Sequence, residues 1–157
     1  MNEMGYTHYW EQPKELDIKK FTEASADCKK ICEAIKAPIQ MESDDSSPPV
    51  FSEKQILFNG VLAEGHETFL FSRSRGVLPQ DYPSRDVSGN LYFSFCKTAS
   101  KPYDLAVCCC LIVLKHHFGD TIRVSSDGGD VDWHPAVEAC QQQLGYGSLP
   151  FASEVRS

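Results

Sequence analysis

Several features that mark well-known protein classes are missing from this chain. The longest apolar run, Leu105 to Leu114, is about half as long as a membrane-spanning helix requires, and residues 1–10 carry no apolar segment typical of a secretory signal. Acidic residues outnumber basic ones by 22 to 15, giving a net charge of −7. A general binder of nucleic-acid duplexes needs the opposite balance to displace counterions from phosphates. We therefore expect a cytoplasmic protein with no membrane and no duplex as partner.

Familiar catalytic and cofactor motifs are also missing. The sequence contains no GxSxG, HExxH or GxxxxGK[ST] segment. Cys28 and Cys32 share one face of a predicted helix, but no second Cys or His pair stands at zinc-site spacing, and His116 and His117 point apart on a helix. We expect no cofactor and no metal ion, and we leave open whether the chain is an enzyme.

Disulfide bonds are not indicated by the cysteine pattern. The count of seven is odd, and Cys108, Cys109 and Cys110 are adjacent. Neighbouring side chains on a helix diverge by about 100°, so these three cannot bridge one another. We interpret them as small apolar packing residues in a reduced protein.

The pattern of residues predicts one α+β domain over residues 1–157. We expect two layers, with three helices on an antiparallel or mixed sheet of about five strands. An exposed loop is expected near 42–49, and a loosely held tail from about 148. The elements follow from period-2 and helical spacing: strands over 5–12, 55–60, 66–73, 90–97 and 121–126, and helices over 17–36, 103–118 and 135–144.

The segment from Phe95 to His117 is the most informative. Its apolar run leaves no face for water, so this helix should be buried. Thr98 or Ser100 could cap its start, and Asp104 adds a favourable negative charge there. Two lysines, Lys97 and Lys101, flank the same end, where backbone N–H groups favour anions. The alternative, two solvated surface lysines, stays open.

Aromatic residues alternate along the first predicted strand. Tyr6, His8 and Trp10 share one face, with Thr7 and Tyr9 on the other. On an open sheet face such rings stack on a base or a sugar. Under a helix they would instead be core residues, with His8 hydrogen-bonded inside.

Four further sites have a functional and a structural interpretation. His66 is a candidate base or a turn residue. Asp127 and Asp130 could bind Mg²⁺ or face the lysines, but DGGD is also a good turn. Cys96 would act as a nucleophile only with a lowered pKa. The fourth is the long loop Ser74–Gly89, a lid or a plain connection, whose arginines could reach inward: Arg75 and Arg85.

A set of short motifs gives the chain a resemblance to a known group. The motifs are GYTHYW at 5–10, FNG at 58–60, HETF at 66–69, FCKTASKPYD at 95–104 and VSSDG at 124–128. Together they resemble a family of small uncharacterised proteins of phages and diverse microbes. The likeness covers most of the chain, and the family has no established activity, so the resemblance implies a phage-related setting and no mechanism.

These observations favour a non-catalytic binder of a small anionic, nucleotide-like ligand. The segment from Arg73 to Lys101 contains five basic and two acidic residues, which gives it a local charge of +3 in an acidic protein. One alternative is a hydrolase or transferase with His66 or His8 as base; another is an interaction module whose open sheet face binds a protein or a second copy. The candidate ligand-binding residues are Lys97, Lys101, Thr98, Tyr6, His8, Trp10, His66, Arg75, Arg85 and Asp127.

Overall fold

The computed structural model describes residues 6–76 and 91–152 of the chain. It confirms the predicted α+β class with three helices. The helices are α1 (Ile18–Ala34), α2 (Asp104–Phe118) and α3 (Asp130–Leu144). The strands are β1 (Thr7–Pro13), β2 (Ile39–Gln40), β3 (Val50–Phe51), β4 (Gln55–Gly60), β5 (Phe69–Ser72), β6 (Leu91–Lys97) and β7 (Arg123–Ser126).

The strands form two antiparallel sheets, where the sequence predicted one. Strand β1 lies at the centre of the first sheet, between β6 and β7. In the second sheet β4 pairs with β5 along one edge and with the short strands β2 and β3 along the other. Two-residue strands are too short to show a period-2 pattern, so β2 and β3 could not be predicted from the sequence.

Side chains and single backbone bonds join the two sheets. The Gln12 amide donates to the carbonyl of Ser72 at 2.7 Å, and the backbone N–H of Glu67 donates to the carbonyl of Lys97 at 3.2 Å. The guanidinium of Arg75 lies buried in this seam, where it donates to the Ser94 hydroxyl and, at 3.3 Å, to the Gln12 side chain. Arg75 therefore connects the sheets and does not extend from a lid.

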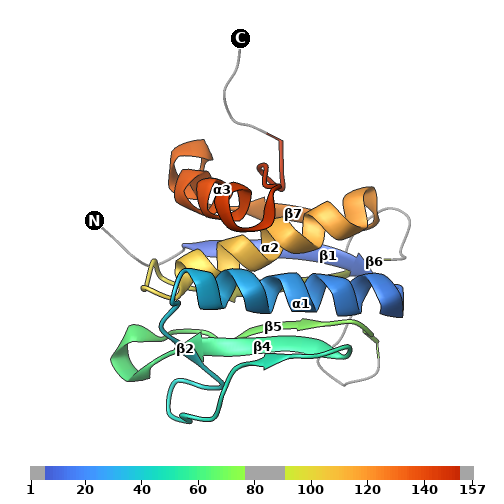
Figure 1. The fold of residues 1–157 in the computed structure, drawn as a ribbon. Helices are drawn as coiled ribbons and strands as arrows, with labels where there is room; N and C mark the ends of the chain where they lie inside the picture. Colours follow the sequence, from blue (N-terminus) through green and yellow to red (C-terminus); the bar gives the residue numbers. More distant parts are fainter. Residues whose placement is uncertain (1–5, 77–90, 153–157) are drawn as a thin grey trace.

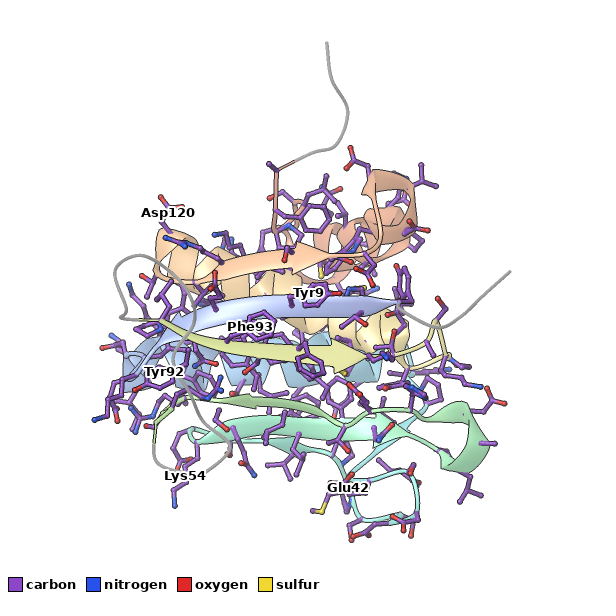
Figure 2. The ribbon with its side chains drawn as sticks, turned by 180° about the vertical axis from the view of Figure 1, so that it is seen from behind. Tyr9, Glu42, Lys54, Tyr92, Phe93 and Asp120 are labelled. Carbon is purple, nitrogen blue, oxygen red and sulfur yellow. The ribbon has the colours of Figure 1, made fainter. Side chains whose placement is uncertain are left out.

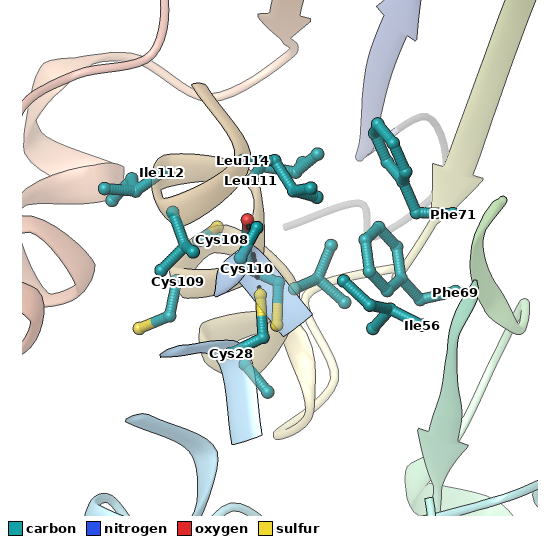
Figure 3. Packing of buried hydrophobic residues seen from close by; sticks show 14 of the residues in the cluster. Cys28, Ile56, Phe69, Phe71, Cys108, Cys109, Cys110, Leu111, Ile112 and Leu114 are labelled. Carbon is teal, nitrogen blue, oxygen red and sulfur yellow. Dashed lines mark hydrogen bonds between the residues drawn. The ribbon is translucent and has the colours of Figure 1, made fainter. Parts of the chain in front are cut away.

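All three helices cover the same side of the strands. Figure 1 shows them in front of the strands, and in Figure 2, seen from behind, the strands come in front. Every side chain from Ala106 to Leu114 is buried, as the absence of a polar face predicted. Figure 3 shows part of the resulting core, to which α2 contributes its three adjacent cysteines. All seven cysteines belong to the described residues, and each is a buried free thiol.

Two chain segments differ from expectation. Helix α3 begins at Asp130, five residues before Pro135, because the Asp132 carboxylate accepts the N–H of Gly129 at 2.9 Å and caps the earlier start. Part of the tail expected from about 148 packs on the domain: Pro150 is buried, and the Phe151 ring packs on Trp133 at 5.2 Å. Among the described helices, none has the length and apolar character needed to cross a membrane.

Candidate functional site

The two faces of β1 have different environments. His8 and Trp10 point toward the helices and are 0% and 1% exposed; the Trp10 ring packs on Phe69 and Phe71 at 5.4 Å each. An open stacking face formed by Tyr6, His8 and Trp10 is therefore not what the structure has. The sequence pattern placed these residues together correctly, but their face of the strand is the covered one.

The opposite face of the same sheet carries its own aromatic cluster. We call Tyr9, Phe93 and Phe95 the aromatic face. The Tyr9 and Phe93 rings stack at 6.1 Å, and Phe95 follows Phe93 at 6.0 Å. Figure 2 shows Tyr9 and Phe93 on the side turned away from the helices. Because Phe95 is 48% exposed, the cluster is accessible from solvent.

Charged side chains surround the aromatic face. Strand alternation puts the Lys97 side chain on the same side as Phe95, at the last register position of β6, opposite Thr7. Asp127 lies nearby, and its carboxylate accepts the Thr7 N–H and the Tyr9 hydroxyl, both at 3.0 Å. Within the described part of the chain, no carboxylate forms an ion pair with the Lys97 ammonium. Lys97 is thus a cation available beside exposed aromatic rings.

A second group of polar side chains lies beneath the sheet, at the start of α2. His8 Nε2 lies 2.6 Å from Asp104 Oδ1, and His8 Nδ1 lies 2.8 Å from Ser126 Oγ. The Thr98 hydroxyl donates to the same Asp104 oxygen at 2.6 Å. We call His8, Asp104, Thr98, Ser126 and Cys108 the buried cluster. Thr98 is fully buried in it, so it positions Asp104 and does not face a surface ligand.

The donors around Ser126 determine where the hydroxyl proton of Ser126 and the imidazole proton of His8 lie. Ser126 Oγ accepts the Gly128 N–H at 2.9 Å and the Trp133 indole N–H at 3.1 Å. Both lone pairs of the hydroxyl are then used, so its proton goes to His8 Nδ1 and the imidazole donates from Nε2 to Asp104. The residue types are those of a Ser–His–Asp triad, but Ser126 has no lone pair left for attack and His8 is fully buried. This arrangement does not favour His8 as a catalytic base.

Cys108 completes the buried cluster. Its sulfur lies 3.6 Å from both His8 Nε2 and Asp104 Oδ2. Burial, followed by the Asp104 charge, raises the pKa of this thiol well above its usual value. His8, Asp104 and Cys108 are three groups close enough together that they could hold a metal ion, and sequence reasoning missed this combination. The sequence feature that could have revealed part of it is the Asp104–Cys108 spacing, which places both residues on one helix face. No sequence feature indicated that His8 lies beside them.

Backbone strain marks the loop that enters α2. Ala99 and Ser100 both have left-handed backbone angles, with φ of 53° and 58°, which cost side-chain-bearing residues roughly 1–2 kcal/mol each. The Ala99 N–H donates to the Tyr6 carbonyl at 3.3 Å, which ties this loop to β1. Strained residues of this kind concentrate at functional sites, and here they adjoin both Lys97 and the buried cluster.

Replacing Ser100 by glycine should raise the free energy of unfolding by about 0.5–1 kcal/mol, because glycine has no steric penalty at this positive φ. Ser100 is exposed, so the change removes no packing. Urea denaturation measures the effect. Ser46→Gly, at another exposed loop position, is the control and should not stabilise; a lower midpoint for Ser100→Gly would contradict the strained geometry.

The other predicted residues fall outside these two groups. Lys101 is half-buried at the start of α2, and its backbone N–H bonds the Thr98 carbonyl at 3.0 Å. His66 is exposed at a turn held by Asn59. Burial raises the pKa of Cys96 to about 12, so it is not an activated nucleophile. Arg85 and most of the loop Ser74–Gly89 lie outside the described residues.

No family model, no curated protein and no solved structure matches the chain.

Proposed function

We propose that the protein is a non-catalytic binder of a small anionic ligand with a planar ring, such as a nucleotide, and that the ligand lies on the aromatic face. The observation that supports this most is the aromatic face, where the Tyr9 and Phe93 rings stack and the Phe95 ring is 48% exposed. On the same face, the Lys97 ammonium forms no ion pair with a carboxylate of the described residues. A heterocyclic base stacks on exposed aromatic rings of a sheet. A phosphate attached to it would reach the Lys97 ammonium.

The charge distribution limits the size of the ligand. Favourable binding of a long polyanion requires many cations, whereas this face offers Lys97 at one end and Arg123 at the other. Arg123 already faces Glu11, at 3.7 Å between Nη1 and Oε1. A mononucleotide matches one available cation and one exposed ring, and the net charge of −7 repels anything much longer.

The binding prediction is tested with two variants of the site. Adenosine and uridine monophosphates are titrated into the wild-type chain by isothermal calorimetry. Phe95→Ala removes the most exposed ring, and base–aromatic stacking contributes about 1–3 kcal/mol, so affinity should fall by roughly 5- to 150-fold. Lys97→Ala should also weaken binding, and the loss should become smaller as salt is raised.

Matched controls lie on other surfaces. Val131→Ala removes an apolar side chain that is 86% exposed at the start of α3, and Lys19→Ala removes an exposed lysine of α1, on the helical side. Both should bind like the wild type. If neither nucleotide binds at millimolar concentration, or if Phe95→Ala and Lys97→Ala bind normally in the folded state, the proposal is wrong.

Self-association through the same face is the second candidate. It is favoured by the 48% exposure of Phe95, a large apolar side chain on the sheet face opposite the described helices. Sedimentation velocity distinguishes the two functions. A concentration-dependent dimer that Phe95→Ala dissociates, with no nucleotide binding, would support the interaction module over the ligand binder.

A further inference from the structure

We propose that the buried cluster is a binding site for a zinc-type divalent ion, with His8 Nε2, Cys108 Sγ and a carboxylate oxygen of Asp104 as its three protein ligands. The inference does not depend on the proposed nucleotide binding, because the cluster lies beneath the sheet and the aromatic face lies above it. It departs from the sequence-based expectation of no metal, which considered Cys and His pairs close in sequence and the Asp127–Asp130 turn.

The distances between the ligand atoms suit a tetrahedral ion. Bonds of about 2.0–2.3 Å hold nitrogen, oxygen and sulfur ligands roughly 3.3–3.6 Å apart around zinc. The two distances that involve Cys108 Sγ are both 3.6 Å. The short His8–Asp104 distance of 2.6 Å involves the other carboxylate oxygen, Oδ1. If Oδ1 is the ligand, this pair must open by about 0.7 Å; if Oδ2 is the ligand, the hydrogen bond to Oδ1 is replaced by the ion.

The three ligands are held from rigid elements. Asp104 and Cys108 lie one turn apart on α2, and His8 comes from the central strand of the first sheet. The Thr98 hydroxyl donates to Asp104 from behind, and Ser126 Oγ lies 2.8 Å from the far nitrogen of His8, where it can accept the Nδ1 proton once the hydroxyl has turned. Such outer partners fix the orientation of metal-binding imidazoles and carboxylates.

The donor set selects the ion. One imidazole, one thiolate and one carboxylate favour Zn²⁺ or Co²⁺ over Mg²⁺ and Ca²⁺, which prefer oxygen ligands only. On binding, Cys108 loses its proton to solvent, and the His8 proton moves from Nε2 to Nδ1. The Ser126 hydroxyl must then turn its own proton away from His8 and release one of its two N–H donors, Gly128 or Trp133, so that it can accept from Nδ1. The Asp104 side chain is 18% exposed while His8 is fully buried, so water could reach a fourth position on the Asp104 side.

Cobalt titration tests the site with the full-length chain. After dialysis against EDTA, Co²⁺ is added, and a thiolate-to-cobalt charge-transfer band is followed in the near ultraviolet. We expect the band to saturate at one ion per chain and to disappear in Cys108→Ala. Cys109→Ala is the matched control, since it removes the next buried thiol of the same helix, and it should keep the band.

Thermal unfolding provides a second readout. Zn²⁺ should raise the unfolding temperature of the wild type and of Cys109→Ala, but not that of Cys108→Ala. Surface carboxylates and histidines cannot produce the thiolate band, so binding there is recognised by its absence. No band in the folded wild type, or an equal band in folded Cys108→Ala, would overturn the proposal. If Cys108→Ala does not fold, Cys108→Ser takes its place under the same criteria.

Discussion

Replacing Asp104 by alanine should lower the free energy of unfolding of the metal-free protein by about 2–6 kcal/mol, because two buried donors lose their acceptor and each costs about 1–3 kcal/mol when left unsatisfied. The carboxylate accepts from His8 at 2.6 Å and from Thr98 at 2.6 Å. Both partners are fully buried, so each would lose its hydrogen bond without water to replace it. Urea denaturation in the presence of EDTA measures the effect.

Two further variants separate the network from a general effect of charge. Asp104→Asn keeps an oxygen that accepts from the same donors, so it should cost only about 1–2 kcal/mol. Asp120→Ala removes an exposed carboxylate just after the end of α2 and should change stability by less than about 0.5 kcal/mol. An Asp104→Ala midpoint equal to that of Asp120→Ala would show that the buried cluster does not hold α2 against the sheet.

The second large effect is expected from Leu111→Ala. Leu111 is 0% exposed in the middle of α2, and Figure 3 shows it on the side of the helix turned toward the strand that carries Phe69 and Phe71. The truncation leaves a cavity among packed side chains, which typically costs about 2–5 kcal/mol.

The control for this variant is an apolar residue outside the core. Val131→Ala truncates a side chain that is 86% exposed, so its urea midpoint should stay near that of the wild type. A Leu111→Ala midpoint within error of the Val131→Ala midpoint would mean that α2 is not the centre of the core.

The sequence predicted where helices and strands lie better than it predicted which face of each strand is covered and which is exposed. Ten consecutive apolar residues leave only one interpretation for α2, which is burial. Strand β1 is different, because both of its faces carry aromatic rings, and its pattern does not say which face is covered. That information lies in β6: the register pairs Tyr9 with Phe95 and Glu11 with Phe93, which places three rings on one side.

The buried cluster could not be predicted from the sequence for a related reason. Asp104 and Cys108 are one helical turn apart, but His8 is 96 positions from Asp104 and 118 from Ser126 along the chain. Pairing across such distances depends on which strands become neighbours. The left-handed angles of Ala99 and Ser100 were equally unreadable, since neither residue type favours that conformation and the surrounding fold imposes it.

Ligand mapping by nuclear magnetic resonance tests the central claim, that the aromatic face is the binding surface. Adenosine monophosphate is titrated into the isotope-labelled chain, and shifts of backbone amides and aromatic ring protons are followed. The account predicts the largest changes at Tyr9, Phe93, Phe95 and Lys97, with none at the hollow of about 410 Å³ between Lys36 and Phe51 on the other side of the molecule. Changes centred on that hollow, or no changes at a saturating concentration, would contradict it.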